Sequence, residues 1–380
     1  MMAMSYRGPS RVRVERKPDP EIEHPNDAIL RVTRATICGS DLHLYHGLVP
    51  DTRVGSTFGH EFTGVVEEVG PTVRNVKRGD RVVVPFNVFC GSCFFCQREL
   101  YACCDSTNPN SSVVGGVYGY SHTTGGYDGG QAQYVRVPFA DAGPFKIPDD
   151  MGEEDVLFLS DIIPTGYQAA EMGNIRDGDT VVVFGCGPVG VIAARSAWLL
   201  GAGRVICVDK VDYRLDFVSR YAHAETLDFR ETDDVVLALR RMTEGRGPDV
   251  CLDAVGLEAS GSVMHKVLGA LKLEAGAPTV IEWCINSVRK AGTVVLIGVY
   301  GPPWNLVPIG TAMSKGLTLR MAQAHVRRDM PQMLEHVRAG RLDPHPLITH
   351  RFPLSAVDEG YHMFAHRQDG MMKCVLYPEA

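Results

Sequence analysis

Residues 180–198 read TVVVFGCGPVGVIAARSAW. An apolar run is followed by Gly185, Gly187 and Gly190 in the spacing G-x-G-x-x-G, and then by a segment that resembles an amphipathic helix. The first glycine permits a tight turn, the second a close approach of the backbone to a ligand, and the third close packing of helix on strand. The stretch therefore predicts a strand, a turn and a helix, which begin a parallel α/β domain.

The turn is typical of sites that bind the pyrophosphate of a dinucleotide, because a helix N-terminus offers free N–H groups and partial positive charge. The expected contacts are Gly185, Gly187, Pro188, Val189 and Gly190. The alternative is a glycine turn in an α/β fold that holds another ligand or none.

The next apolar strand, RVICVD, ends in Asp209. A carboxylate there accepts hydrogen bonds from the ribose hydroxyls and repels a 2′-phosphate, so NAD is predicted over NADP. Lys210 and Arg214 are also expected near the cofactor, and their positive charges weaken that preference.

The chain is predicted to be an α/β protein of two domains. From Asp161 onward apolar strands alternate with helical segments, which predicts a doubly wound parallel sheet over residues 161–322. Before it, short alternating segments such as AILRVTRAT and FTGVVEEVG predict a small β-barrel over residues 1–160, with a glycine-rich loop at 115–130. Residues 323–380 return to a helix and short strands, and the terminal strand MMKCVLYP is expected to join the barrel.

Composition excludes several classes of function. The net charge of -7 argues against an extended nucleic-acid surface. No apolar run reaches the length of about 20 residues that a membrane helix needs. The first residues, MMAMSYRGPSRVRVERKPDP, lack the apolar segment of a secretory signal, so a cytoplasmic location is expected.

Four of the eleven cysteines are spaced as C-x2-C-x2-C-x7-C in CGSCFFCQRELYACC. They are Cys90, Cys93, Cys96 and Cys104, and Cys103 is an alternative fourth ligand. Short spacers let successive thiolates turn back on one ion, and a closed four-thiolate zinc site has no position open to substrate. A structural zinc is therefore predicted. The alternatives are an iron–sulfur cluster, and free thiols or a disulfide.

A second metal site is predicted from three separate segments. Cys38 in TICGSD and His60 in FGHEF each lie in a glycine-containing turn after a β-segment, and SDIIPTG offers Asp161 at the start of the second domain. Thiolate, imidazole and carboxylate at about 2.0–2.3 Å would hold a zinc ion with one position open to substrate. Glu61 is predicted to be a catalytic residue, and it is an alternative oxygen ligand of this zinc ion.

Such an open site activates a bound alcohol or hydrated aldehyde, which gives up hydride to a nicotinamide while a proton leaves. Ser40 is predicted to accept that proton first, and His43 to pass it to solvent. The alternative is that Ser40 caps a helix, with Asp41 near its first turn, and that His43 is merely exposed.

Together these residues resemble the zinc-dependent medium-chain alcohol dehydrogenases. The resemblance is carried by ICGSD, GHEFTGVVEEVG, GDRVVV, the cysteine spacing, PTGYQAA and GCGPVG, along nearly the whole chain. Within the family, VPFNVFCGSC, GGVYGY, GGQAQYV and LSDIIPTGY are most similar to the glutathione-independent formaldehyde dehydrogenase and formaldehyde dismutase branch.

The resemblance implies a discontinuous GroES-like catalytic domain and an inserted Rossmann domain, with zinc and nicotinamide in the cleft between them. It implies two zinc ions per subunit, with Cys38, His60 and Asp161 around the active-site ion. It also implies that Phe86 lines the substrate pocket and that the backbone of Val299 approaches the nicotinamide amide. A small alcohol or aldehyde is the implied substrate, and a homo-oligomer, a dimer or tetramer, the implied assembly.

The chain departs from the formaldehyde-active branch in one respect. It lacks that branch's extra residues around the cofactor domain and its long C-terminal region, which favours an exchangeable cofactor. A polyol or a threonine-like secondary alcohol is therefore an alternative substrate. Two other hypotheses are a zinc-free NADPH-dependent quinone or enone reductase, which needs neither Cys38 nor His60, and a non-catalytic binding protein of the same fold.

Overall fold

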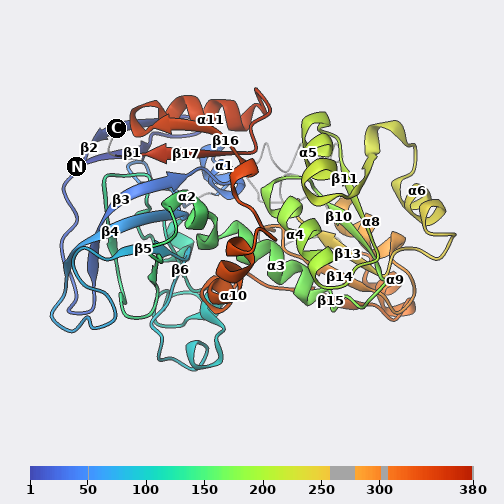
Figure 1. Cartoon of the computed structure of the whole chain (residues 1–380), viewed down its shortest axis with the longest axis horizontal. Coiled ribbons are helices and arrows are strands. Elements are labelled where there is room, and N and C mark those ends of the chain that lie inside the picture. The colour runs from blue at the N-terminus through green and yellow to red at the C-terminus, as the bar shows by residue number, and fades with distance from the viewer. Residues whose placement is uncertain (50, 257–278, 301–306, 379–380) are drawn as a thin grey trace. The chain divides into compact units, whose positions relative to one another are not determined.

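The computed structural model describes residues 1–49, 51–256, 279–300 and 307–378 (Figure 1). The chain divides into two compact units, Met1–Pro164 with His325–Ala380, and Thr165–Ala324. The 3-10 helix η4 (Leu157–Ser160) packs within unit 1, where Ser160 O accepts the Phe86 N–H at 2.9 Å. Compared with the predicted bounds, residues 161–164 group with unit 1 and residues 323–324 with unit 2.

Unit 1 is built around β3 (Ala28–Thr36), whose alternating sequence AILRVTRAT is largely buried. Within the described residues it lies in a seven-stranded sheet of order β16-β17-β3-β4-β5-β9, with β8 also paired to β3. The other members are β4 (Phe62–Val69), β5 (Arg81–Val84), β8 (Tyr134–Val137), β9 (Phe145–Lys146), β16 (Ile348–Pro353) and β17 (Lys373–Tyr377). Two further pairs are β1 (Met2–Tyr6) with β2 (Val12–Arg16), and β6 (Asn87–Val88) with β7 (Gly116–Val117).

The C-terminal strand joins the first part of the chain, as the sequence predicts. β17 is antiparallel to β3, with Val375 opposite Thr36 and Leu376 opposite Ala35. Helices α1 (Gly39–Tyr45), α2 (Glu153–Val156), α10 (Val326–Arg338) and α11 (Val357–Ala365) also belong to unit 1. Short 3-10 turns are η1 (Cys96–Arg98), η2 (Tyr101–Cys103), η3 (His122–Thr124), η7 (His345–Leu347) and η8 (Leu354–Ala356).

Unit 2 contains, within the residues described, a six-stranded parallel sheet of order β12-β11-β10-β13-β14-β15. The strands are β10 (Thr180–Phe184), β11 (Arg204–Asp209), β12 (Glu225–Asp228), β13 (Val250–Asp253), β14 (Thr293–Leu296) and β15 (Thr318–Met321). This is the doubly wound 3-2-1-4-5-6 order. The central strands are continuously apolar because helices cover both of their faces.

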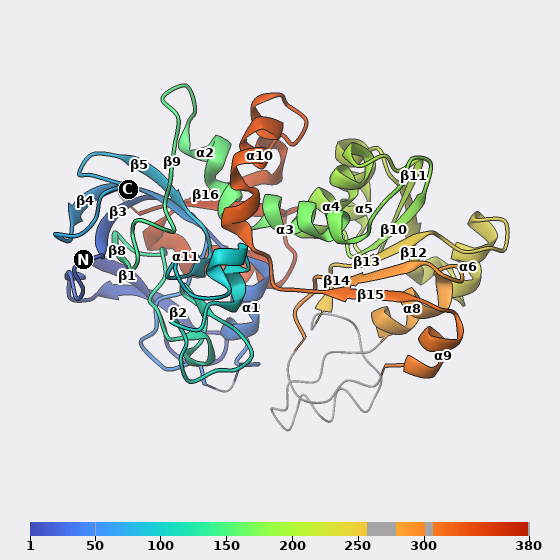
Figure 2. The ribbon, with the colours of Figure 1, turned by 90° about the horizontal axis from the view of Figure 1, so that it is seen from below.

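The two helical layers of unit 2 are visible in Figure 2, with α4 and α5 on one face and α6, α8 and α9 on the other. Their bounds are α4 (Pro188–Leu199), α5 (Asp212–Ala222), α6 (Val235–Met242), α8 (Thr279–Ser287) and α9 (Ile309–Ser314), with the turn η5 (Phe229–Glu231). Helix α3 (Ile162–Met172) begins in unit 1 and continues into unit 2. The strand order reverses between β10 and β13, so the carboxyl ends of these two strands mark the switch point where ligands bind in such sheets.

Among the described residues, no helix combines the length and apolar character of a membrane span.

Candidate active site and metal centres

The glycine turn follows β10 and opens α4. Gly185 has φ +91°, and a side chain there would bring its Cβ within 2.7 Å of Val255 Cγ2. A Cβ on Gly190 would lie 1.8 Å from Gly185 O, so helix and strand pack as closely as the third glycine of the motif predicts. Around Gly187 the space is open, with Arg214 Nη1 3.9 Å from a Cβ placed there. The turn therefore leaves room for a ligand at the N-terminus of α4.

Asp209 lies beside that turn, with its side chain largely buried at the end of β11. Its Oδ2 accepts the Cys186 N–H at 2.7 Å, and its Oδ1 accepts the N–H groups of Lys210 and Val211 at 2.6 and 3.1 Å. The carboxylate thus holds the glycine turn as well as occupying the position predicted for ribose recognition. The ammonium of Lys210 lies 6.0 Å from the centre of the Phe229 ring.

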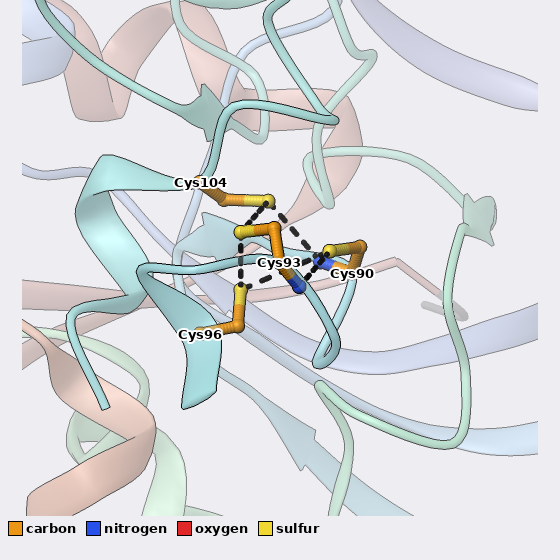
Figure 3. A group of neighbouring side chains, drawn as sticks. All are labelled: Cys90, Cys93, Cys96 and Cys104. Carbon is orange, nitrogen blue, oxygen red and sulfur yellow. Dashed lines mark hydrogen bonds between the residues drawn. The ribbon is translucent and has the colours of Figure 1, made fainter. Parts of the chain in front are cut away.

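The four predicted cysteines of unit 1 bring their sulfur atoms together (Figure 3). The Sγ–Sγ distances are 3.5 Å for Cys93–Cys96 and 3.9 Å for both Cys90–Cys96 and Cys93–Cys104. A zinc tetrahedron with Zn–S bonds of about 2.3 Å has edges of about 3.8 Å. A disulfide would need about 2.05 Å. The spacing fits one tetrahedral ion.

Backbone groups favour the thiolate form at Cys90 and Cys93, whereas burial raises the pKa of Cys96 and Cys104. Cys90 Sγ accepts the Cys93 N–H at 3.3 Å, and Cys104 Sγ accepts the Cys90 N–H at 3.3 Å. Burial alone would raise the pKa of Cys90, but hydrogen bonds from Ser106 and Ser92 outweigh it and lower the pKa to about 6. Cys103, the alternative ligand, is exposed and lies outside the group of four.

The second donor group consists of Cys38, His60, Glu61 and Asp161, whose ligand atoms all lie within 4.8 Å of one another. Cys38 Sγ is 3.6 Å from Asp161 Oδ2, and His60 Nε2 is 3.2 Å from the same oxygen. All four side chains are buried. The sequence prediction that Cys38, His60 and Asp161 converge therefore has direct geometric support.

Strand pairing explains this convergence. Ala35 lies opposite Phe62 in the β3–β4 ladder, and the Thr36 N–H donates to Glu61 O at 3.3 Å. Cys38 follows β3 and His60 precedes β4, so the two side chains meet at the same end of the strand pair. Asp161 follows η4, which contacts both β4 and β5.

Asp41 orients two of these residues. Its Oδ2 accepts the Cys38 N–H at 2.9 Å and its Oδ1 lies 3.4 Å from His60 Nδ1, so Nε2 of the imidazole faces the other donors. Burial alone would lower the pKa of His60, but Asp41 and Asp161 outweigh it and raise the pKa well above its ordinary value. Metal-bound histidines generally have such a carboxylate behind them, and sequence reasoning did not assign this role to Asp41.

Sequence reasoning also missed Lys373, a fully buried lysine in β17. Its Nζ donates to Glu61 Oε2 and, at 3.2 Å, to Ile37 O. Lysine is rarely buried unless paired, so its place in the apolar segment MMKCVLYP was the available signal. Glu61 Oε1 is buried without a hydrogen-bond partner in the protein.

Charge in this pocket fits a divalent cation. When ionised, Cys38, Glu61, Asp161 and the neighbouring Asp41 carry four negative charges, whereas Lys373 and a protonated His60 supply two positive ones. Burial accordingly raises the pKa of Cys38 and Glu61. A buried excess of negative charge is costly unless a cation compensates it. The donor set of sulfur, imidazole nitrogen and carboxylate oxygen is also one that zinc accepts.

The remaining predicted residues lie on or beside this site. Ser40 is in the first turn of α1, and its Oγ is 3.3 Å from His60 Nε2. The alternative in which Ser40 caps the helix is wrong, since the N-cap position is Cys38. His43 is 5% exposed, so the alternative of an exposed surface histidine is also wrong. Phe86 packs edge-on against His60, with ring centres 6.1 Å apart.

Comparisons with known proteins agree with both halves of this structure. Residues 24–149 match the family model "Alcohol dehydrogenase GroES-like domain", and residues 188–274 match "Zinc-binding dehydrogenase". An uncharacterized zinc-type alcohol dehydrogenase-like protein, AdhB of Bacillus subtilis strain 168, is 43% identical over 100% of both chains. A glutathione-independent formaldehyde dehydrogenase of Pseudomonas aeruginosa is 39% identical over 78% of this chain and 74% of its own.

Among solved structures, the alcohol dehydrogenase TADH from Thermus sp. ATN1 has a TM-score of 0.84 at 34% identity, covering 99% of each chain. The fold therefore combines a GroES-like domain with a Rossmann domain, as predicted. The chain belongs to the zinc-type alcohol dehydrogenase family of oxidoreductases.

Proposed function

We propose that the protein transfers hydride between NAD and a small alcohol or hydrated aldehyde at a zinc site formed by Cys38, His60 and Asp161. The observation that carries the proposal is the convergence of these three side chains, together with Glu61, within 4.8 Å. A zinc ion held there would supply a Lewis acid for the substrate oxygen, and NAD would supply the hydride acceptor.

The protein's own groups would orient the substrate and move its proton. Ser40 Oγ, beside His60, would accept the proton of the substrate hydroxyl. His43 lies one helical turn further along α1 and would receive that proton next. Phe86, packed against His60, would supply an apolar wall that limits access of water.

The second ion would be structural. Cys90, Cys93, Cys96 and Cys104 supply four sulfur donors and leave no position for substrate. The lobe around them contains only the short turns η1 and η2 between residues 90 and 104, so cross-linking by an ion would replace regular hydrogen bonding. Two zinc ions per chain are therefore proposed.

For the cofactor, we infer NAD, bound with its pyrophosphate at the Gly185–Gly190 turn. The support is the open space at Gly187 and the carboxylate of Asp209 at the end of β11, where a 2′-phosphate would be repelled. Val299, on the loop that follows β14, would meet the nicotinamide amide with its backbone.

Formaldehyde, as its hydrate, is the proposed substrate for the first assay. The support is 39% identity with the Pseudomonas aeruginosa formaldehyde dehydrogenase, which extends over most of this chain.

We also infer a homo-oligomer. Among the strands that the structure describes, β15 lies at the edge of the unit 2 sheet, and Met321 on it is 61% exposed. Ile309 and Met313 on the neighbouring α9 are 63% and 78% exposed. Exposed apolar side chains beside a strand edge favour association with a second copy.

The decisive experiment combines metal analysis with activity. Purified protein should contain close to two zinc ions per chain and reduce NAD with formaldehyde or a small alcohol, measured by NADH absorbance. Cys38→Ala should lose one zinc and at least about a thousandfold in kcat/KM while remaining folded. Cys103→Ala is the matched control and should keep both ions and full activity. A Cys38→Ala protein with unchanged zinc content and turnover would refute the proposal.

A further inference from the structure

Asp253 is a fully buried carboxylate at the carboxyl end of β13. Its Oδ2 accepts the hydroxyl hydrogen of Tyr300. Its Oδ1 accepts the Val255 N–H at 2.8 Å and the Gly256 N–H at 3.4 Å. The carboxylate therefore holds groups from two loops, one after β13 and one after β14.

The backbone of the same residue reinforces this connection. Asp253 O accepts the N–H groups of Ile297 and Gly298 at 3.0 and 2.9 Å. The loops then touch directly, since a Cβ on Gly256 would lie 2.4 Å from both N and O of Val299. Gly256 has φ +58°, a conformation that favours glycine. The position of the Val299 backbone is thus fixed through Asp253 and Gly256.

These loops lie at the ligand-binding edge of the sheet. Val255 is next to Gly185 of the glycine turn, so the β13 loop borders the proposed pyrophosphate site. The strand order places β11 and Asp209 on one side of β10, and β13 and β14 on the other. If Asp209 faces the adenosine ribose, the second half of the dinucleotide must extend over the β13 and β14 loops.

We propose that the Asp253–Tyr300 pair is a positioning device for the nicotinamide half of the cofactor. The pair would hold the loop after β14 in the position in which the Val299 backbone contacts the nicotinamide carboxamide. This inference rests on the proposed function, because it requires a dinucleotide at the glycine turn.

Because the pair is buried, loss of the Tyr300 hydroxyl should affect the loop that the pair holds and not the glycine turn. The Tyr300 hydroxyl donates to a carboxylate that water does not reach, so removing the hydroxyl leaves Oδ2 without that donor. Burial raises the pKa of Asp253, although hydrogen bonds from Tyr300 and the two N–H groups oppose the rise. Without the Tyr300 hydroxyl, the loop after β14 would relax away from Gly256. The glycine turn would stay in place, because Asp209 holds it separately.

The test is Tyr300→Phe in the full-length, zinc-replete protein, with Tyr221→Phe on α5 as the control for losing a hydroxyl elsewhere in unit 2. The dissociation constant of NADH is measured by fluorescence titration, and that of ADP-ribose, which lacks nicotinamide, by competition. We expect Tyr300→Phe to weaken NADH binding roughly five- to tenfold and to change ADP-ribose binding less than about twofold.

Equal weakening of both ligands, or of neither, would overturn the inference while leaving the proposed function intact. If the wild-type protein binds neither NADH nor ADP-ribose, the proposed function fails and the inference fails with it. Thermal unfolding of each variant separates a local effect from loss of the fold. A Tyr300→Phe protein with wild-type melting temperature and an unchanged ratio of the two dissociation constants counts against the proposal.

Discussion

The carboxylate of Asp41 lies behind His60, with Oδ1 3.4 Å from Nδ1 of the imidazole. The other oxygen of Asp41 accepts the Cys38 N–H and, at 3.3 Å, a hydrogen from Gln131 Nε2. Tyr361 in turn donates to Gln131 Oε1 at 2.9 Å. Two proposed zinc ligands are therefore oriented by one side chain, which the barrel core holds in place.

Asp41→Asn should weaken zinc binding at the active site. The variant retains the side-chain volume but loses the negative charge behind the imidazole, and such changes typically cost about 10–100-fold in metal affinity. Competition with a chelator measures the loss for each zinc. Asp369→Asn, whose side chain is 80% exposed, is the control and should leave both affinities unchanged. Equal affinities for Asp41→Asn and wild type would contradict the orienting role.

Lys373→Met should destabilise the protein, because it leaves the Glu61 carboxylate buried without its cation. Removing one partner of a buried ion pair costs about 3–5 kcal/mol. Combining it with Glu61→Gln should recover much of this loss. The free energy of unfolding is measured by urea denaturation at fixed free zinc, since metal binding itself stabilises the folded state. Additive effects of the two substitutions would show that the pair is not coupled.

Asp209→Asn and Asp209→Ala should both relax the preference for NAD over NADP, since each removes the charge that repels a 2′-phosphate. Asp209→Asn keeps an oxygen for the Cys186 N–H, so it should retain more affinity for both cofactors than Asp209→Ala. The ratio of kcat/KM for the two cofactors is the measurement. A wild-type enzyme that already favours NADP would rule out the role assigned to Asp209.

Stability should fall in acid through Glu154. Arg351 donates to this carboxylate at 2.7 Å, and Tyr377 also donates to it. The hydrogen bond from Arg351 is the main reason that the pKa of Glu154 is lowered from 4.5. Below pH 4.5 the unfolded chain binds more protons here than the folded one, so the stabilisation present above that pH is lost as pH falls through the folded-state pKa.

Glu154→Gln tests this linkage. The difference in free energy of unfolding between wild type and this variant should be largest near neutral pH and should shrink as pH falls below 4.5. Denaturation at a series of pH values measures it. A difference that does not depend on pH would assign the contribution of Glu154 to packing.

Short-range patterns in the sequence were sufficient for the glycine turn and the four-cysteine group, because spacing alone brings these residues together. Cys38, His60 and Asp161 were predicted as a set from chemistry and family resemblance, although the pairing of β3 with β4 explains why the first two meet and the contacts of η4 with β4 and β5 explain the place of Asp161. The apolar segment around Lys373 could predict its burial but not its partner, and Tyr300 could not be found this way. Each acts on a partner in another strand or loop, and no local pattern records that contact.

The Glu61–Lys373 pair joins residues that are 312 positions apart in the chain. Strands β3 and β4 can pair as soon as the first part of unit 1 has been synthesised, so the thiol and the imidazole can meet early. The ammonium group arrives only with β17, after all of unit 2 has been made. Until β17 docks, Glu61 lacks the ammonium that pairs with it in the folded protein. The electrostatic balance of the pocket thus depends on the docking of β17 against β3.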